Sequence, residues 1–175
     1  RGFSLYDAKD IYDYASYCKH TLWANGAAAT LSRLGIVLYR YEDARVTLKA
    51  GVHFAVKEWG TVTYDENDDS VYTSTGSTAP KAPGEYYVKL AGKAPYKGER
   101  TFTFRILDTF DLSEYNYDVV DALAADGKGV TLAQLKLSVY REDEAGNKVT
   151  LKYGTDYAFD SWKGYVYDSD ESLTG

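Results

Sequence analysis

The chain contains two stretches of similar sequence, and this internal repeat constrains its fold more than any other feature. Residues 46–59 read VTLKAGVHFAVKEW, and residues 149–162 read VTLKYGTDYAFDSW, at an offset of 103. Upstream, residues 29–40 match residues 130–141 at an offset of 101. Solenoid repeats are about 20–50 residues long, so a period of this length predicts tandem domains instead.

The offset between the copies changes once, where the second copy carries two additional residues in a segment that includes Gly146 and Asn147. Both residue types favour turns, and insertions are tolerated at exposed turns. We therefore expect the additional residues at a hairpin tip. The repeat further predicts that segments 10–65 and 111–168 superpose strand for strand.

The local pattern is that of β-strands. Residues 101–106, TFTFRI, alternate strictly, and residues 85–90, EYYVKL, alternate in the same way. Residues 35–40 and 136–141 are rich in β-branched and aromatic residues. Such runs, divided by Gly, Asn, Asp and Pro, indicate an all-β sandwich or barrel.

Three segments are less regular. Residues 6–23 and 131–137 have a mixed periodicity that a helix could also explain, but both recur in strand-like surroundings, so we predict mostly strand. Residues 72–84, YTSTGSTAPKAPG, are rich in Ser, Thr, Gly and Pro, and we predict a long loop between strands. The alternative for this loop is a mobile binding site.

Aromatic residues recur at the same positions of both copies. We predict that they anchor the core, because large apolar side chains are mostly buried. A sugar-stacking platform is the alternative. The residues are Phe54, Trp59 and Tyr64 in the first copy and Tyr157, Trp162 and Tyr167 in the second.

Composition and motifs exclude several classes of function. The net charge of −6 disfavours nucleic acid and anionic membranes as partners, and no apolar run reaches the roughly 18 residues of a membrane span. Cys18 is the single cysteine, so we expect a small buried hydrophobe. With two histidines and no known catalytic motif, we predict neither an enzyme nor a cofactor. Pairs of acidic residues such as Asp7 with Asp10 are interpreted as solvated turns.

The sequence DENDDS, residues 65–70, has the spacing of a calcium-binding loop. Asp65, Asn67 and Asp69 would be the ligands. An EF-hand loop also needs Gly at its sixth position and Glu at its twelfth, where this chain has Ser70 and Gly76. We favour an acidic turn without metal and leave calcium as the alternative. An intramolecular isopeptide bond is a further alternative, and it needs a buried lysine.

Three motifs carry a family resemblance. They are PGEYYVKLAGKAPYKGERTFTFRI (83–106), DLSEY (111–115) and TLKYGTDYAFDS (150–161). In this order they resemble tandem modules in large surface proteins and fibrillar adhesins of Firmicutes and Actinobacteria. The first copy departs from the pattern, with AGVHFAV where GTDYxV is expected.

The resemblance implies a complete module at 1–106 and a second module at 107–175 that lacks the last two strands. We predict tandem antiparallel β-sandwich (Ig-like) modules, with a small β-grasp-like module as the alternative. We expect the strands missing from the second module to come from residues beyond Gly175, from another molecule or from residues 1–9.

The function implied by the resemblance is structural. We expect non-catalytic stalk or spacer modules of a bacterial cell-surface or secreted adhesin-like protein, located in the cell wall or outside the cell, with neighbouring modules as partners. One alternative is a β-sandwich that binds a host glycan or protein through residues 72–84 and nearby aromatics. Another is an accessory domain of a secreted hydrolase. We expect no nucleic-acid partner and no membrane insertion of this fragment.

Overall fold

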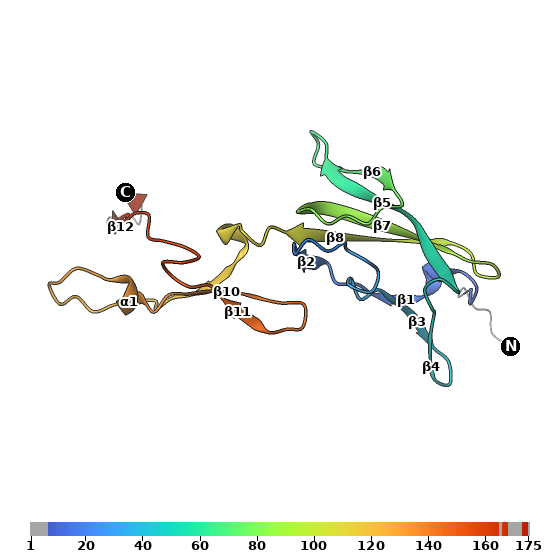
Figure 1. Ribbon diagram of the computed structural model, residues 1–175, viewed down its shortest axis with the longest axis horizontal. Coiled ribbons are helices and arrows are strands. Elements are labelled where there is room, and N and C mark those ends of the chain that lie inside the picture. The colour runs from blue at the N-terminus through green and yellow to red at the C-terminus, as the bar shows by residue number, and fades with distance from the viewer. Residues whose placement is uncertain (1–6, 165, 168–172, 175) are drawn as a thin grey trace. The chain divides into compact units, whose positions relative to one another are not determined.

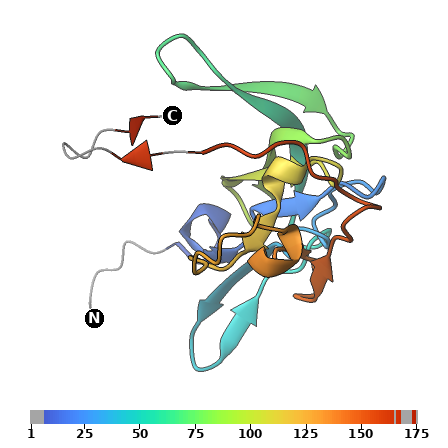
Figure 2. The same cartoon turned by 90° about the vertical axis from the view of Figure 1, so that its left-hand side faces the viewer.

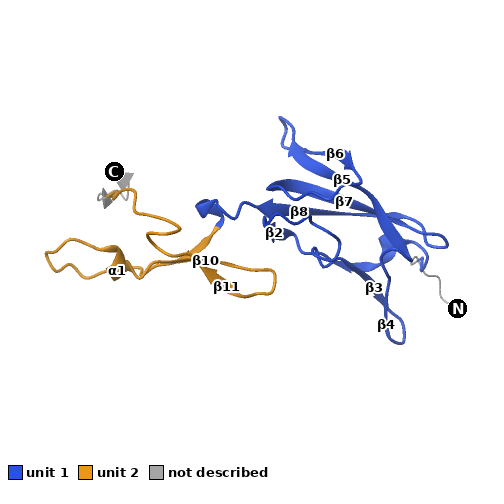
Figure 3. Ribbon diagram, viewed as in Figure 1, with its two compact units in different colours: residues 1–114 blue, residues 115–175 orange. Residues whose placement is uncertain are grey.

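The computed structural model describes residues 7–164, 166–167 and 173–174, and these residues form an all-β structure with almost no helix (Figure 1). The chain divides into two compact units, residues 1–114 and residues 115–175 (Figure 3). Each unit is described by itself.

Unit 1 contains two sheets that share one core. The three-stranded sheet has the order β1-β3-β4, and the five-stranded sheet has the order β2-β8-β7-β5-β6. Side chains of both sheets belong to a single buried cluster. The elements are η1 (Ile11–Asp13), β1 (Ala15–Tyr17), β2 (Thr21–Trp23), β3 (Val37–Tyr41), β4 (Arg45–Thr47), β5 (Phe54–Tyr64), β6 (Ser70–Gly76), β7 (Gly84–Gly92), β8 (Glu99–Leu107) and η2 (Leu112–Glu114).

The predicted strands at 85–90 and 101–106 are confirmed as β7 and β8. Along β8 the apolar residues Phe102, Phe104 and Ile106 are buried, while the residues between them are exposed. One pairing differs from the predicted antiparallel sheets, because β2 runs parallel to β8. The β5–β6 and β3–β4 hairpins extend from unit 1 in opposite directions (Figure 2).

The predicted loop at 72–84 is wrong for its first part. Residues 70–76 form β6, which pairs with β5 along its length and leaves only residues 77–83 as loop. Every residue of β6 is exposed, as an edge strand allows, so a polar composition rich in Ser and Thr does not prevent pairing.

Unit 2 contains a three-stranded sheet of order β11-β10-β9 and the pair β12–β13. The predicted strand at 136–141 is confirmed as β10, but the prediction of strand for 131–137 is wrong. Thr131 and Gln134 there form a capping box that begins the helix α1. The elements are β9 (Asn116–Asp118), α1 (Leu132–Leu135), β10 (Ser138–Glu142), β11 (Lys148–Thr150), β12 (Val166–Tyr167) and β13 (Leu173–Thr174).

The strand pairings of unit 2 have the same register as pairings in unit 1, after shifts of 101 and 103 residues. This holds for β9–β10 against β1–β3, for β10–β11 against β3–β4, and for β12–β13 against the tip of β5–β6. The pair Ser16–Leu38 corresponds to Tyr117–Val139. Likewise Arg40–Val46 corresponds to Arg141–Val149, and Tyr64–Ser70 corresponds to Tyr167–Leu173.

The turn after β4 and the turn after β11 also match. His53 Nδ1 accepts a hydrogen bond from the backbone N–H four residues before it, at 2.7 Å. Asp156 Oδ2 accepts the equivalent bond at 2.6 Å. The glycines in these turns, Gly51 and Gly154, have φ of 83° and 85°, a backbone conformation that disfavours other residues. Gly146 lies in the β10–β11 hairpin turn, where the insertion was expected.

The correspondence ends at the segments that in unit 1 pair with β7 or β8. Residues 122–124, the counterpart of β2, and residues 158–164, the counterpart of most of β5, form no strand. In unit 1, β2 pairs with β8 and β5 pairs with β7. Unit 2 has no such partners among its described residues, so these backbone groups have no ladder to join.

The predicted core aromatics are more buried in unit 1 than in unit 2, with Tyr64 as the exception. Phe54 and Trp59 are buried, as predicted, and Tyr157 is half-buried. The prediction is wrong for Tyr64, which is 55% exposed at the hairpin tip, and for Trp162, which is 56% exposed because no strand covers it. The side chain of Tyr167 lies outside the described residues.

Candidate functional site

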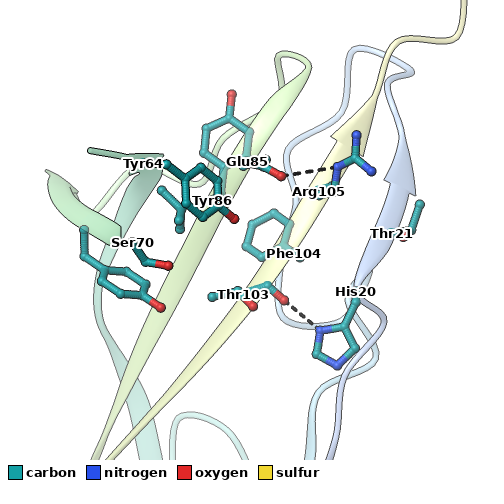
Figure 4. A pocket seen from close by; sticks show the side chains of 11 residues that line it. His20, Thr21, Tyr64, Ser70, Glu85, Tyr86, Thr103, Phe104 and Arg105 are labelled. Carbon is teal, nitrogen blue, oxygen red and sulfur yellow. Dashed lines mark hydrogen bonds and ion pairs between the residues drawn. The ribbon is translucent and has the colours of Figure 1, made fainter. Parts of the chain in front are cut away.

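A cleft of about 370 Å³ lies on unit 1, mainly on the face of the five-stranded sheet that points away from the core (Figure 4). Strands β2, β5, β6, β7 and β8 all contribute to it. The lining residues are His20, Thr21, Val62, Tyr64, Ser70, Tyr72, Glu85, Tyr86, Thr103, Phe104 and Arg105.

Strand alternation explains why most of these side chains share the outward face, while Tyr86 and Phe104 belong to the core side of the sheet. In β8 the buried residues alternate with Thr103 and Arg105, which therefore point outward. Arg105 lies opposite Glu85 in β7, and Tyr64 lies opposite Ser70 across the β5–β6 hairpin. Cross-strand neighbours of this kind bring polar and aromatic groups together.

The polar groups at the β8 side of the cleft are held in place. His20 Nδ1 lies 2.7 Å from the Thr103 carbonyl oxygen, so Nδ1 donates and carries the proton. Arg105 lies 3.6 Å from the carboxylates of both Glu85 and Glu114. Glu85 is the single carboxylate among the described residues that line the cleft, and it is paired. The arrangement suits binding of hydroxyl or charged groups, whereas glycoside hydrolysis needs two facing carboxylates.

A buried tyrosine lies beside the cleft. Tyr87 faces outward from β7 yet is buried, and its ring packs edge-on against Tyr72 at 5.2 Å. Its hydroxyl donates to Glu58 at 3.0 Å. Burial, with the nearby Glu58 carboxylate, raises the pKa of Tyr87, while hydrogen bonds from Ser74 and then Tyr87 lower the pKa of Glu58.

The ring of Tyr87 lies against Gly60 of β5. A Cβ at Gly60 would come within 2.3 Å of the Tyr87 ring and 2.4 Å of the Thr73 carbonyl oxygen. Sequence reasoning did not single out either residue. A glycine inside a strand is the signal that could have done so, since it marks a close approach.

The candidate calcium ligands lie in the β5–β6 turn between Tyr64 and Ser70, and they are not among the residues that line the cleft. Asp65 Oδ1 accepts hydrogen bonds from the backbone N–H of Asn67 and of Asp69, at 2.8 and 3.0 Å. In the β10–β11 turn Asp143 Oδ1 makes the equivalent pair of bonds, at 3.0 and 2.8 Å. Asp65 thus holds the turn together through its side chain. The described residues contain no cluster of three His, Cys, Asp or Glu suited to an ion.

The remaining candidate residues have structural roles. Asp7 pairs with Lys97 at 3.0 Å, and Asp10 caps η1 by accepting from the Tyr12 N–H. Cys18 is buried, as predicted, and burial raises the pKa of its thiol to about 11. No lysine among the described residues is buried, which removes the basis for an isopeptide bond.

Comparison with known proteins finds no match to a protein-family model, to a curated protein or to a solved structure. Within the part of the chain that the structure describes, no helix has the length and apolar character needed to cross a membrane.

Proposed function

We propose that the chain is a non-catalytic structural protein made of tandem β modules, and that unit 1 is built to carry tension between its two ends. A stalk or spacer of a bacterial cell-surface or secreted protein needs this property. The resemblance to Gram-positive surface modules supports that setting. The recurring strand registers support duplication of a framework, while cleft residues change: His20, for example, is replaced by Asp121.

One observation carries the proposal: a segment near the start of unit 1, residues 9–24, is hydrogen-bonded in the same direction to a segment near its end, residues 97–107. Leu22 of β2 pairs with Ile106 of β8 in a parallel ladder. The Arg105 N–H donates to the His20 carbonyl at 2.8 Å, and the Ala24 N–H donates to the Leu107 carbonyl at 2.9 Å.

The parallel contact continues towards the N-terminus. The Ile11 N–H donates to the Lys97 carbonyl at 2.9 Å, and the Lys97 N–H donates to the Lys9 carbonyl at 2.7 Å. Arg100 Nη1 donates to the carbonyls of Tyr12 and Tyr14, each at 2.7 Å, and Arg100 Nη2 lies 2.9 Å from Ser16 Oγ.

Parallel alignment matters when the ends are pulled apart. Tension on the N-terminal end of β2 and the C-terminal end of β8 slides the two segments past one another. The hydrogen bonds between the segments run across that motion and are strained together, so several must break in one event. Forced unfolding is governed by this barrier and not by equilibrium stability.

Single-molecule pulling of the full chain tests the role. Handles at residues 8 and 108 strain the parallel contact in shear, and handles at residues 8 and 67 do not. We expect a higher unfolding force for the first pair.

Arg100→Ala should lower that force, because it removes three bonds between the segments. Arg105→Ala on the same strand is the control, since its side chain forms ion pairs with Glu85 and Glu114 and not with residues 9–24. Equal forces for both pairs of handles would refute the tension-bearing role.

The cleft favours a second function, binding of a glycan or an extended peptide. Tyr64 and Tyr72 are both more than half exposed at its edge, and exposed aromatic faces stack on sugar rings. A glycan array with the full chain tests this function. We expect that Tyr72→Ala abolishes any signal, while Tyr41→Ala, an exposed tyrosine on β3, leaves it unchanged.

A further inference from the structure

Unit 2 exposes apolar residues whose counterparts in unit 1 lie in or against the core. We name Leu123, Val130, Phe159 and Trp162 the open face of unit 2. Leu123 is 41% exposed, whereas its counterpart Leu22 is fully buried. The other three counterparts, Ala29, Val56 and Trp59, belong to the same core of unit 1 or pack against it.

In unit 1 two strands cover these positions. Val88 and Leu90 of β7 and Phe102, Phe104 and Ile106 of β8 are all buried in that core. The Trp59 ring packs edge-on against Phe104 at 6.0 Å. The exposure in unit 2 is therefore what unit 1 would show without β7 and β8.

We infer that the open face of unit 2 binds a basic pair of antiparallel β-strands of the β7–β8 type, and not a second copy of unit 2. The strands would pair with residues 122–124 and 158–164, which form no strand in unit 2. Strand addition of this kind uses main-chain hydrogen bonds for affinity and alternate side chains for specificity.

Charge favours a basic strand pair over a second copy of unit 2. Residues 115–175 contain eleven Asp and Glu and six Lys and Arg, which gives a net charge of −5. Residues 84–107 contain five Lys and Arg and two Glu, which gives +3. A basic strand pair is attracted to unit 2, whereas two copies of unit 2 repel each other.

Hydrogen exchange on the full chain tests the inference, with a synthetic peptide of residues 83–107 as the probe. We expect amide exchange at 122–124 and 158–164 to slow by at least about tenfold with saturating peptide. The control is the same peptide with Val88→Ser, Phe102→Ser and Phe104→Ser, which should have no effect. In the chain, Leu123→Asp should abolish the protection, while Val52→Asp, at an exposed site in unit 1, should preserve it.

Three outcomes would overturn the inference. They are unchanged exchange in unit 2, protection changes confined to unit 1, and self-association of the chain that protects the open face without peptide. The last outcome would assign the face to a second copy. The inference goes beyond the tension-bearing role and uses the correspondence between the units alone. Failure of the pulling experiment would therefore not affect this inference. Failure of the exchange experiment would likewise not affect the tension-bearing role.

Discussion

Trp59 and Trp162 occupy equivalent sequence positions in the two units, and their surroundings differ completely. Trp59 is 4% exposed, lies in an eleven-residue strand and packs against Phe104, while Trp162 is 56% exposed and lies in no strand. Seven of the fourteen residues that end at each tryptophan are identical. The difference follows from strand pairing: β5, which contains Trp59, pairs with β7, whereas no described strand pairs with residues 158–164.

The parts of the units that do match depend on short-range interactions. Hairpins and turns such as β3–β4 and β10–β11 form from residues close in sequence, with Asx turns and glycines at defined positions. Strands β2 and β5 are different, because their partners in unit 1 lie far along the chain. The same hairpins and turns can therefore form in both units, although the apolar residues beside them are buried only in unit 1.

The largest difference between the units should appear on truncating the two tryptophans. Trp59→Ala should lower the free energy of unfolding by about 3–5 kcal/mol, because it opens a cavity in a packed core. Trp162→Ala should change it by less than about 0.5 kcal/mol, as for other exposed side chains. Urea unfolding followed by circular dichroism measures both. Equal losses would mean that the two positions are packed alike.

A smaller effect is expected at glycines. Gly60→Ala should destabilise by about 1–3 kcal/mol, because the methyl group meets backbone as well as the Tyr87 ring. Gly129→Ala in unit 2 is the matched control, since nothing lies within 4 Å of its Cβ position. The same urea titration compares the two. A neutral Gly60→Ala would show that the strands of unit 1 can separate freely at this point.

The smallest effect concerns Cys18, whose counterpart in unit 2 is Val119. The folded state raises the thiol pKa from 9.0 to about 11, so it disfavours the thiolate. The contribution to stability is complete below pH 9 and is lost as the pH rises towards 11. We expect Cys18→Val to reduce the loss of stability between pH 8 and pH 10 by about 1 kcal/mol. An identical pH dependence in both proteins would place Cys18 in contact with water.

Sequence reasoning succeeded where a pattern is local. Strict alternation predicted β7 and β8, and glycine and asparagine predicted the β10–β11 turn. It failed for β6, because an edge strand tolerates Ser and Thr, and for Trp162, because similarity to Trp59 carries no information about the missing partner strands. The parallel β2–β8 ladder, the Arg100 contacts and the burial of Tyr87 depend on residues about 30 to 90 positions apart, which no local pattern reveals.

The most direct test of the account is a chain with the missing strands added. The offset of 103 makes Gly175 the counterpart of Tyr72, so residues 73–107 are appended after Gly175. We predict that residues 122–124 and 158–164 then gain amide protection comparable to that of β2 and β5, and that Trp162 becomes inaccessible to acrylamide. Phe102→Ser and Phe104→Ser in the appended segment should prevent both changes. An appended segment that exchanges freely, with Trp162 still quenched, would contradict the claim that a β7–β8 strand pair, which the described residues of unit 2 do not contain, accounts for the difference between the units.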